Sequence, residues 1–216
     1  MHDFCVAPHG GREMICQGVS PLLAVDELGL PGRHNVLNVM AALAMADAAG
    51  VNIPVASAAA KQFSGLAHRC ELVAKIGGVS FINDSKATNV GACIAALQGF
   101  AQPGKRLVLI AGGQTKSADF APLAKVVAAT CSELVLLGSG ADEIAKACRA
   151  VNADSPEINF ATNMDEAVAL AARAARPGDI VLLSPACASF DMYSGFEARG
   201  NAFRQAVEAL AGGGRA

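Results

Sequence analysis

The sequence predicts an α/β domain with a doubly wound, mostly parallel sheet and helices on both faces. A shorter segment with a different sequence pattern precedes this domain. Two observations carry this prediction. Short apolar runs alternate with amphipathic helical patterns from about residue 67 to the end, and the runs are continuously apolar, which is typical of strands buried on both faces. Hydrophobic residues make up 53% of the 216 residues and charged residues 17%, so the chain has enough apolar side chains for a large core.

The elements of the predicted sheet follow one another in regular order. Two β-rich runs, 71–76 and 79–83, are separated by Gly77-Gly78, a two-residue spacing typical of a hairpin. Four further strands then alternate with helices, and Asp119 is expected to cap one of these helices. The strands are expected at 106–111, 133–137, 157–161 and 179–183, and the helices at 89–98, 119–130, 140–150, 164–175 and 197–211.

The first part of the chain has a different composition and sequence pattern. Residues 1–33 are rich in glycine and proline and predict strand fragments and turns without an evident core. A helix is expected from His34 to Ala49, because apolar residues recur at helical spacing and Gly50 follows its last turn. A second helix is expected from Pro54 to Phe63. The exposed apolar faces of these helices predict marginal order or self-association.

Charge and hydropathy exclude several classes of protein. The net charge of −2 lacks the basic surface that nucleic-acid-binding proteins need, so no nucleic-acid partner is expected. No apolar stretch reaches the roughly 18 residues that span a bilayer, and the first residues lack the pattern of a secretion signal, so no membrane partner is expected. Seven cysteines without a C-x-x-C pair indicate reduced thiols. We therefore expect a cytoplasmic protein, and no spacing of cysteine and histidine predicts a metal site.

Polar loops follow three of the expected strands at their carboxyl ends, where ligands bind in open α/β sheets. Two of the loops place a lysine, Lys86 or Lys116, shortly before the amino end of a helix. Because free N–H groups there already favour an anion, these lysines predict a site for a small molecule with more than one carboxylate. The alternative is that both are ordinary solvated loop residues. The loops are Asp84–Asn89, Gly112–Ser117 and Ser184–Ser189.

Three further polar residues in these loops each admit two interpretations. Thr88 and Ser189 either bind the ligand or cap a helix and close a turn. Asp84 either contacts a nucleotide ribose or orients Lys86, or else it stabilises a turn. The residues by themselves leave both interpretations open.

One segment partly matches a phosphate-binding motif. Gly99–Lys105 matches G-x-x-x-x-G-K, the start of a P-loop, but Arg106 follows it in place of Ser or Thr. The segment also precedes a strand, whereas a P-loop follows a strand and opens a helix, so we interpret Pro103-Gly104 as a turn. A dinucleotide-binding dehydrogenase is likewise disfavoured, because no G-x-G-x-x-G follows a first strand.

Three longer strings make the sequence resemble the Mur ligase family, and within it the ligases that add D-glutamate. The most specific strings are D-S-K-A-T-N at 84–89 and S-P-A-C-A-S at 184–189, and the match runs from about residue 30 to 211 in the expected order. Upstream, Gly32–Asn38 resembles a helix start near the end of that family's central domain. The strings are Gly65–Arg69 with Phe81–Asn89, Gly112-Gly113 with Lys116–Phe120, and Leu183–Asp191.

The resemblance implies two domains and a reaction. Residues 1–66 would be the distal part of an ATP-binding central domain, incomplete and without its P-loop, and residues 67–216 a Rossmann-like domain that binds the amino acid. In the family, ATP phosphorylates the carboxylate of UDP-N-acetylmuramoyl-L-alanine, and the amine of D-glutamate attacks the acyl phosphate. An amide forms as phosphate leaves, which is a step in the synthesis of peptidoglycan precursors.

The resemblance also implies roles for individual residues. Lys86 and Lys116 fall at positions that bind the anionic substrates and serve catalysis. ATP and Mg²⁺ are the implied cofactors of the complete enzyme, whose main phosphate and metal ligands are absent from this sequence. The implied D-glutamate positions are Thr88, Lys116, Ser189, Phe190 and Phe196, and the implied nucleotide positions are Asn38, His68, Arg69 and Asp84.

Two departures from the family pattern matter. Gln114 and Thr115 stand where an acidic residue and a glycine are expected before Lys116, and threonine adopts a positive φ less easily than glycine. The P-loop, the metal ligands and the UDP-binding domain are also missing, so we expect a fragment that does not catalyse ligation alone. Two alternatives stay open: a non-catalytic α/β module that binds a small anion, and a sister ligase similar to folylpolyglutamate synthase.

Overall fold

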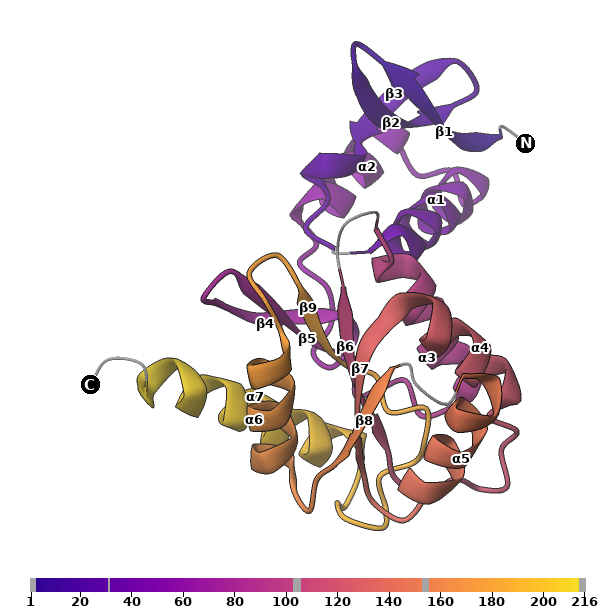
Figure 1. The fold of residues 1–216 in the computed structure, drawn as a ribbon. Helices are drawn as coiled ribbons and strands as arrows, with labels where there is room; N and C mark the ends of the chain where they lie inside the picture. The colour runs from indigo at the N-terminus through magenta and orange to yellow at the C-terminus, as the bar shows by residue number, and fades with distance from the viewer. Residues whose placement is uncertain (1–2, 31, 103–105, 153–155, 214–216) are drawn as a thin grey trace. The chain divides into compact units, whose positions relative to one another are not determined.

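The computed structural model describes residues 3–30, 32–102, 106–152 and 156–213 (Figure 1). The turn expected at Pro103-Gly104 lies outside the described residues. The chain divides into two compact units, Met1–Gly65 and Leu66–Ala216, each of which is described by itself.

The first unit combines a small antiparallel sheet with two helices. The sheet has the strand order β1-β2-β3, and both helices begin and end within one residue of their predicted bounds. Gly50, with φ of 76°, follows the end of the first helix as expected. The elements are β1 (Phe4–His9), β2 (Arg12–Gln17), β3 (Ser20–Ala24), the 3₁₀ turn η1 (Val25–Glu27), α1 (Arg33–Ala48) and α2 (Ile53–Gln62).

This first unit has a core, so the expectation of strand fragments without one is wrong. Ile15 of β2 is fully buried and belongs to one cluster with Val36, Val39 and Leu43 of α1. β1 has no fully buried side chain, and β2 and β3 have two each, which is too few to produce a recognisable pattern in the sequence. The helices still expose large apolar side chains, as expected, and Met45 of α1 is 68% exposed.

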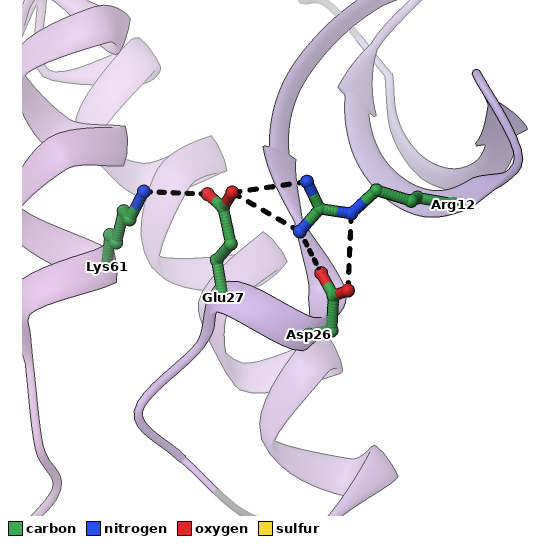
Figure 2. Close-up of polar contacts among 4 residues, drawn as sticks. All are labelled: Arg12, Asp26, Glu27 and Lys61. Atoms are coloured by element: carbon green, nitrogen blue, oxygen red, sulfur yellow. Dashed lines mark hydrogen bonds and ion pairs between the residues drawn. The ribbon is translucent and has the colours of Figure 1, made fainter.

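A network of charged side chains joins the sheet of the first unit to its second helix (Figure 2). The Arg12 guanidinium of β2 contacts the carboxylates of Asp26 and Glu27 in η1, and Lys61 Nζ of α2 lies 2.8 Å from Glu27 Oε2. The Arg12 hydrogen bonds hold the pKa of Asp26 below its usual value, and those of Lys61 and Arg12 lower that of Glu27. Because all four side chains are solvated, the network orients the elements more than it stabilises them.

The second unit contains the predicted sheet, in the order β4-β5-β9-β6-β7-β8. The β4–β5 pair is antiparallel and turns at Gly77-Gly78, which confirms the predicted hairpin, and all other neighbours are parallel. The sequence did not indicate that the last strand inserts between β5 and β6. The strands are β4 (Glu71–Ile76), β5 (Val79–Asn83), β6 (Leu107–Gly112), β7 (Cys131–Leu137), β8 (Glu157–Phe160) and β9 (Ile180–Leu183).

Helices cover both faces of this sheet, which confirms the doubly wound α/β class (Figure 1). Strand β6 shows why its run is continuously apolar: Leu107 and Leu109 enter the core under α3–α5, whereas Val108 and Ile110 enter the core under α6 and α7. Helix α4 begins two residues after Asp119, whose carboxylate accepts the Ala121 N–H at 2.9 Å. The helices are α3 (Val90–Phe100), α4 (Ala121–Thr130), α5 (Ala141–Val151), α6 (Met164–Ala174) and α7 (Phe196–Gly213).

Two further properties bear on the chemistry of the chain. All seven cysteines are free thiols, and burial raises the pKa of Cys131 to about 12 and that of Cys148 to about 11, so these groups pack as neutral apolar side chains. Among the described residues, no helix combines the length and the apolar character that crossing a membrane requires.

Whether the first unit has its own core can be tested by mutation. Leu43→Ala removes a side chain that is 2% exposed and is expected to lower the stability of that unit by about 2–4 kcal/mol. Native-state hydrogen exchange should show faster exchange for the amides of β2 and α1. Met45→Ala, at an exposed site on the same helix, should change these rates little. Equal loss of protection in β6 after Leu43→Ala would contradict the existence of two separate cores.

Candidate functional site

The three polar loops lie at the carboxyl ends of β5, β9 and β6, which are adjacent parallel strands. The loop after β9 is the middle one and bonds to both others. Ala186 N–H donates to Ala87 O at 3.0 Å, and Gly112 N–H donates to Pro185 O at 2.9 Å. Gln114 and Ala188 exchange two backbone hydrogen bonds, at 2.9 and 3.1 Å. The sheet and these bonds therefore hold the predicted loops together at one edge.

The backbone pair between Gln114 and Ala188 depends on a glycine. Gly113 has φ of 124°, and a Cβ there would lie 2.2 Å from Ala188 O. A side chain at this position would push the loop after β6 away from the loop after β9. The second glycine of the G-G pair therefore allows the two backbones to approach.

Both lysines hold their ammonium groups near aromatic rings. Lys86 Nζ lies 4.0 Å from the centroid of the Phe196 ring, and Lys116 Nζ lies 5.9 Å from that of Phe190. Within the described ranges neither ammonium forms a salt bridge with a carboxylate. Lys86 is half-buried and Lys116 is exposed, so both can reach an anion from outside the protein.

The backbone around Lys116 is strained. Lys116 and Ser117 both have left-handed φ angles, 49° and 58°, which cost free energy for residues with a side chain. Thr115 is not among the residues with positive φ. The strained conformation expected at Thr115 is instead adopted by the next two residues. His68 and Ala186 also have positive φ, at 62° and 60°. Such outliers concentrate at functional sites, and here they lie in or beside the three loops.

For Thr88 the structure removes one alternative. The helix cap of α3 is Asn89, whose side chain accepts the Ala92 N–H at 2.9 Å, so the Thr88 hydroxyl is not the cap. Ser189 is 2% exposed, and its carbonyl accepts the N–H groups of Met192 and Tyr193 at 3.1 and 2.8 Å. Ser189 thus begins a turn through its backbone.

The contacts of Asp84 favour the turn-stabilising interpretation. Its carboxylate accepts Ser184 Oγ–H at 2.9 Å and Cys70 N–H at 3.2 Å, and the residue is 7% exposed. Burial raises the pKa of Asp84 to about 6, against the opposing effect of these hydrogen bonds. A contact with a nucleotide ribose stays a prediction.

The remaining proposed nucleotide residues belong to both units. His68 is buried, with Nδ1 3.1 Å from Asn83 Nδ2, and Gly200 leaves room for its ring, since a Cβ there would lie 2.2 Å from Nδ1. Arg69, the next residue, is exposed. Asn38 lies in α1 of the first unit, where it donates to Asn35 Oδ1 at 3.1 Å.

Comparison with known proteins identifies the family of this chain. Residues 68–187 match the family described as Mur ligase, glutamate ligase domain, which covers more than half of the chain. The chain belongs to the Mur ligase family. The predicted resemblance is thereby confirmed.

Curated relatives of this Mur ligase chain share a name. A protein of Marinobacter nauticus named UDP-N-acetylmuramoylalanine–D-glutamate ligase is 52% identical over 196 residues, covering 91% of this chain and 43% of the relative. A protein of the same name from Nitrosococcus oceani is 47% identical over 208 residues, covering 96% of this chain and 45% of the relative. The chain therefore spans less than half the length of these relatives.

Solved structures confirm the fold of the Mur ligase chain. A UDP-N-acetylmuramate–alanine ligase of Thermotoga maritima aligns with a TM-score of 0.64 and 17% identity, covering 92% of this chain and 43% of that one. A folylpolyglutamate synthase of Mycobacterium tuberculosis aligns with a TM-score of 0.62 and 16% identity, covering 96% and 47%. At these identities the likeness concerns the fold alone.

Several residues of the candidate site were not predicted from the sequence. Asn83 ends β5 with a buried side chain that donates to Gly200 O at 3.0 Å and accepts Ser85 N–H at 3.2 Å. Arg199 of α7 is also buried among the loops. A polar residue that ends an apolar strand could have indicated Asn83. Nothing in the pattern of the last helix distinguishes Arg199 from its solvated neighbours. In the described part of this Mur ligase chain, no three metal-ligating side chains gather into a group that could hold an ion.

Asp84 provides a pH-dependent test. Its folded pKa, about 6, exceeds the unfolded value of 3.8, so its contribution to stability is fully present below the unfolded value and is lost as the pH rises through about 6. Asp84→Asn should therefore gain stability relative to the wild type between pH 4 and 7, by up to about 3 kcal/mol. NMR titration of the carboxyl carbon provides the direct measurement. A midpoint near 4 would contradict the burial argument.

Proposed function

We propose that this chain is the amino-acid-binding part of an ATP-dependent ligase that joins D-glutamate to UDP-N-acetylmuramoyl-L-alanine during peptidoglycan precursor synthesis. The observation that supports it most is the 52% identity to a ligase of that name over 196 residues. The proposed site lies at the edge of the sheet where the loops after β5, β9 and β6 meet.

The proposed D-glutamate contacts follow from charge and position. D-glutamate carries two carboxylates, and Lys86 and Lys116 offer two ammonium groups without a salt bridge in the described ranges. Charge-assisted hydrogen bonds to such groups are among the stronger polar contacts that a protein makes. We assign Lys86 and Lys116 to substrate binding and catalysis, with Thr88, Ser189, Phe190 and Phe196 completing the D-glutamate contacts.

Fewer structural observations support the proposed nucleotide contacts. We assign Asn38, His68, Arg69 and Asp84 to the base and ribose of ATP. The exposed Arg69 guanidinium suits such a contact, whereas the Asp84 carboxylate already accepts two hydrogen bonds. ATP, when bound, would supply the phosphoryl group that activates the substrate carboxylate. No residue described here is assigned to Mg²⁺.

The chain by itself is proposed to bind without ligating. It spans 43% of the length of the Marinobacter nauticus relative, and we place the phosphate, metal and UDP-sugar ligands in the remaining length. Because ATP and UDP-sugars are cytoplasmic metabolites, we propose a cytoplasmic location. A non-catalytic module that binds a small anion is the second candidate, supported by the two lysines alone. A folylpolyglutamate synthase-like activity is disfavoured, since that likeness is limited to 16% identity.

Binding of D-glutamate tests the proposal. Titration of the ¹⁵N-labelled chain with D-glutamate should shift amides in all three loops, and L-glutamate should bind at least about tenfold more weakly. Lys116→Met should weaken D-glutamate binding by about tenfold or more, because a charge-assisted hydrogen bond is lost.

Lys125→Met is the matched control for this experiment. Lys125 is an exposed lysine on α4, outside the loops, and its loss should leave the D-glutamate affinity unchanged. Equal affinity of the Lys116→Met variant and the wild type would remove Lys116 from the site. Binding of D- and L-glutamate with the same affinity would instead favour the non-catalytic anion-binding module.

A further inference from the structure

A buried arginine lies where the three loops meet. Arg199, in the first turn of α7, is 2% exposed and is the largest fully buried side chain among the described residues. Its guanidinium donates three hydrogen bonds. Nε donates to Ser85 Oγ at 3.0 Å, Nη2 donates to Ser85 O at 2.9 Å, and Nη1 donates to Cys187 O at 3.1 Å.

The acceptors of Arg199 belong to two of the loops, and the third loop packs beside it. Ser85 directly precedes Lys86, and Cys187 lies two residues before Ser189. A Cβ at Gly113, in the loop after β6, would lie 3.3 Å from Arg199 Nη1. One side chain therefore spans the loops after β5 and β9, and the loop after β6 passes close to it.

Ser85 extends this contact to the ring beneath Lys86. The Ser85 hydroxyl accepts the bond from Arg199 Nε and donates to Phe196 O at 2.8 Å. The Phe196 ring lies 4.0 Å from Lys86 Nζ. Arg199 thus fixes the start of α7 against the loop that carries Lys86.

The cost of burying this cation indicates more than a packing role. Within the described ranges Arg199 has no salt bridge, and its acceptors are two neutral carbonyls and a hydroxyl. Burial lowers the pKa of Arg199 to about 10, with a smaller opposing influence of Cys187, Asp191 and Tyr193, so the group stays charged at neutral pH. A buried charge without a carboxylate partner is expensive, and an apolar side chain would fill the same space at lower cost.

We propose that Arg199 is a positioning residue, which bridges the loops after β5 and β9 so that Lys86, Phe196 and Ser189 meet the same substrate molecule. This inference rests on the proposed function for the identity of that substrate. Arg199 itself touches neither substrate nor nucleotide in the proposal. It acts through Ser85 and Cys187, and the bridge requires the planar, multiply donating guanidinium, since the single ammonium of lysine cannot satisfy acceptors on both loops.

Two variants and one control separate the bridge from general stability. Arg199→Gln removes the charge and most donors, and Arg199→Lys keeps the charge alone. The control is Val207→Ala, on the same helix two turns further along, which removes a fully buried side chain of the core between the sheet, α6 and α7.

The first readout needs no ligand. Hydrogen exchange is compared between two loop amides, Lys86 (bonded to His68 O) and Ala186 (bonded to Ala87 O), and the Leu109 amide in the central strand β6. Both Arg199 variants should speed exchange of the loop amides relative to Leu109 by about tenfold or more. Val207→Ala should leave this ratio unchanged. A ratio that is unchanged in the Arg199 variants would overturn the proposal.

The second readout is D-glutamate binding, measured by amide shifts. Arg199→Gln and Arg199→Lys should each weaken binding by about tenfold, and Val207→Ala should bind as the wild type does. Wild-type affinity in Arg199→Lys would show that the charge alone suffices and would overturn the bridge. If the wild-type chain bound no D-glutamate, the proposed function would fail, whereas the exchange ratio would still decide the bridge.

Discussion

The insertion of β9 between β5 and β6 is the constraint on which the candidate site depends. It makes three strands with polar loops into neighbours and places the loop after β9 between the other two. Backbone bonds such as Ala186 N–H to Ala87 O and the Gln114–Ala188 pair then join the loops across the edge of the sheet. A different strand order would leave the same residues in the same sequence with no common site.

Around that edge the protein tolerates features that do not favour stability. Lys116 and Ser117 have left-handed backbones, Asp84 is a buried carboxyl with a raised pKa, and Arg199 is a buried cation without a carboxylate partner among the described residues. The large apolar cores on both faces of the sheet offset these costs. The result is a hydrogen-bonded polar framework that leaves two ammonium groups, Lys86 and Lys116, available to an anion.

How much the sequence predicts depends on the range of the interactions. The strands and helices of the second unit follow from local periodicity, and the loops follow from polar residues at the ends of apolar runs. Strand order depends on contacts between residues about 100 positions apart, such as Ser184 Oγ with Asp84. The core around Ile15 was missed because each short strand buries few side chains. Arg199 was missed because its burial depends on loops from elsewhere in the chain.

A crystal structure of the chain with bound D-glutamate would show directly which loops contact one ligand molecule. We expect electron density for the amino acid with one carboxylate at Lys116 and with Thr88 and Ser189 within hydrogen-bonding distance of the same molecule. Density that contacts only one loop, or that lies at another edge of the sheet, would show that the three loops do not form a common D-glutamate site.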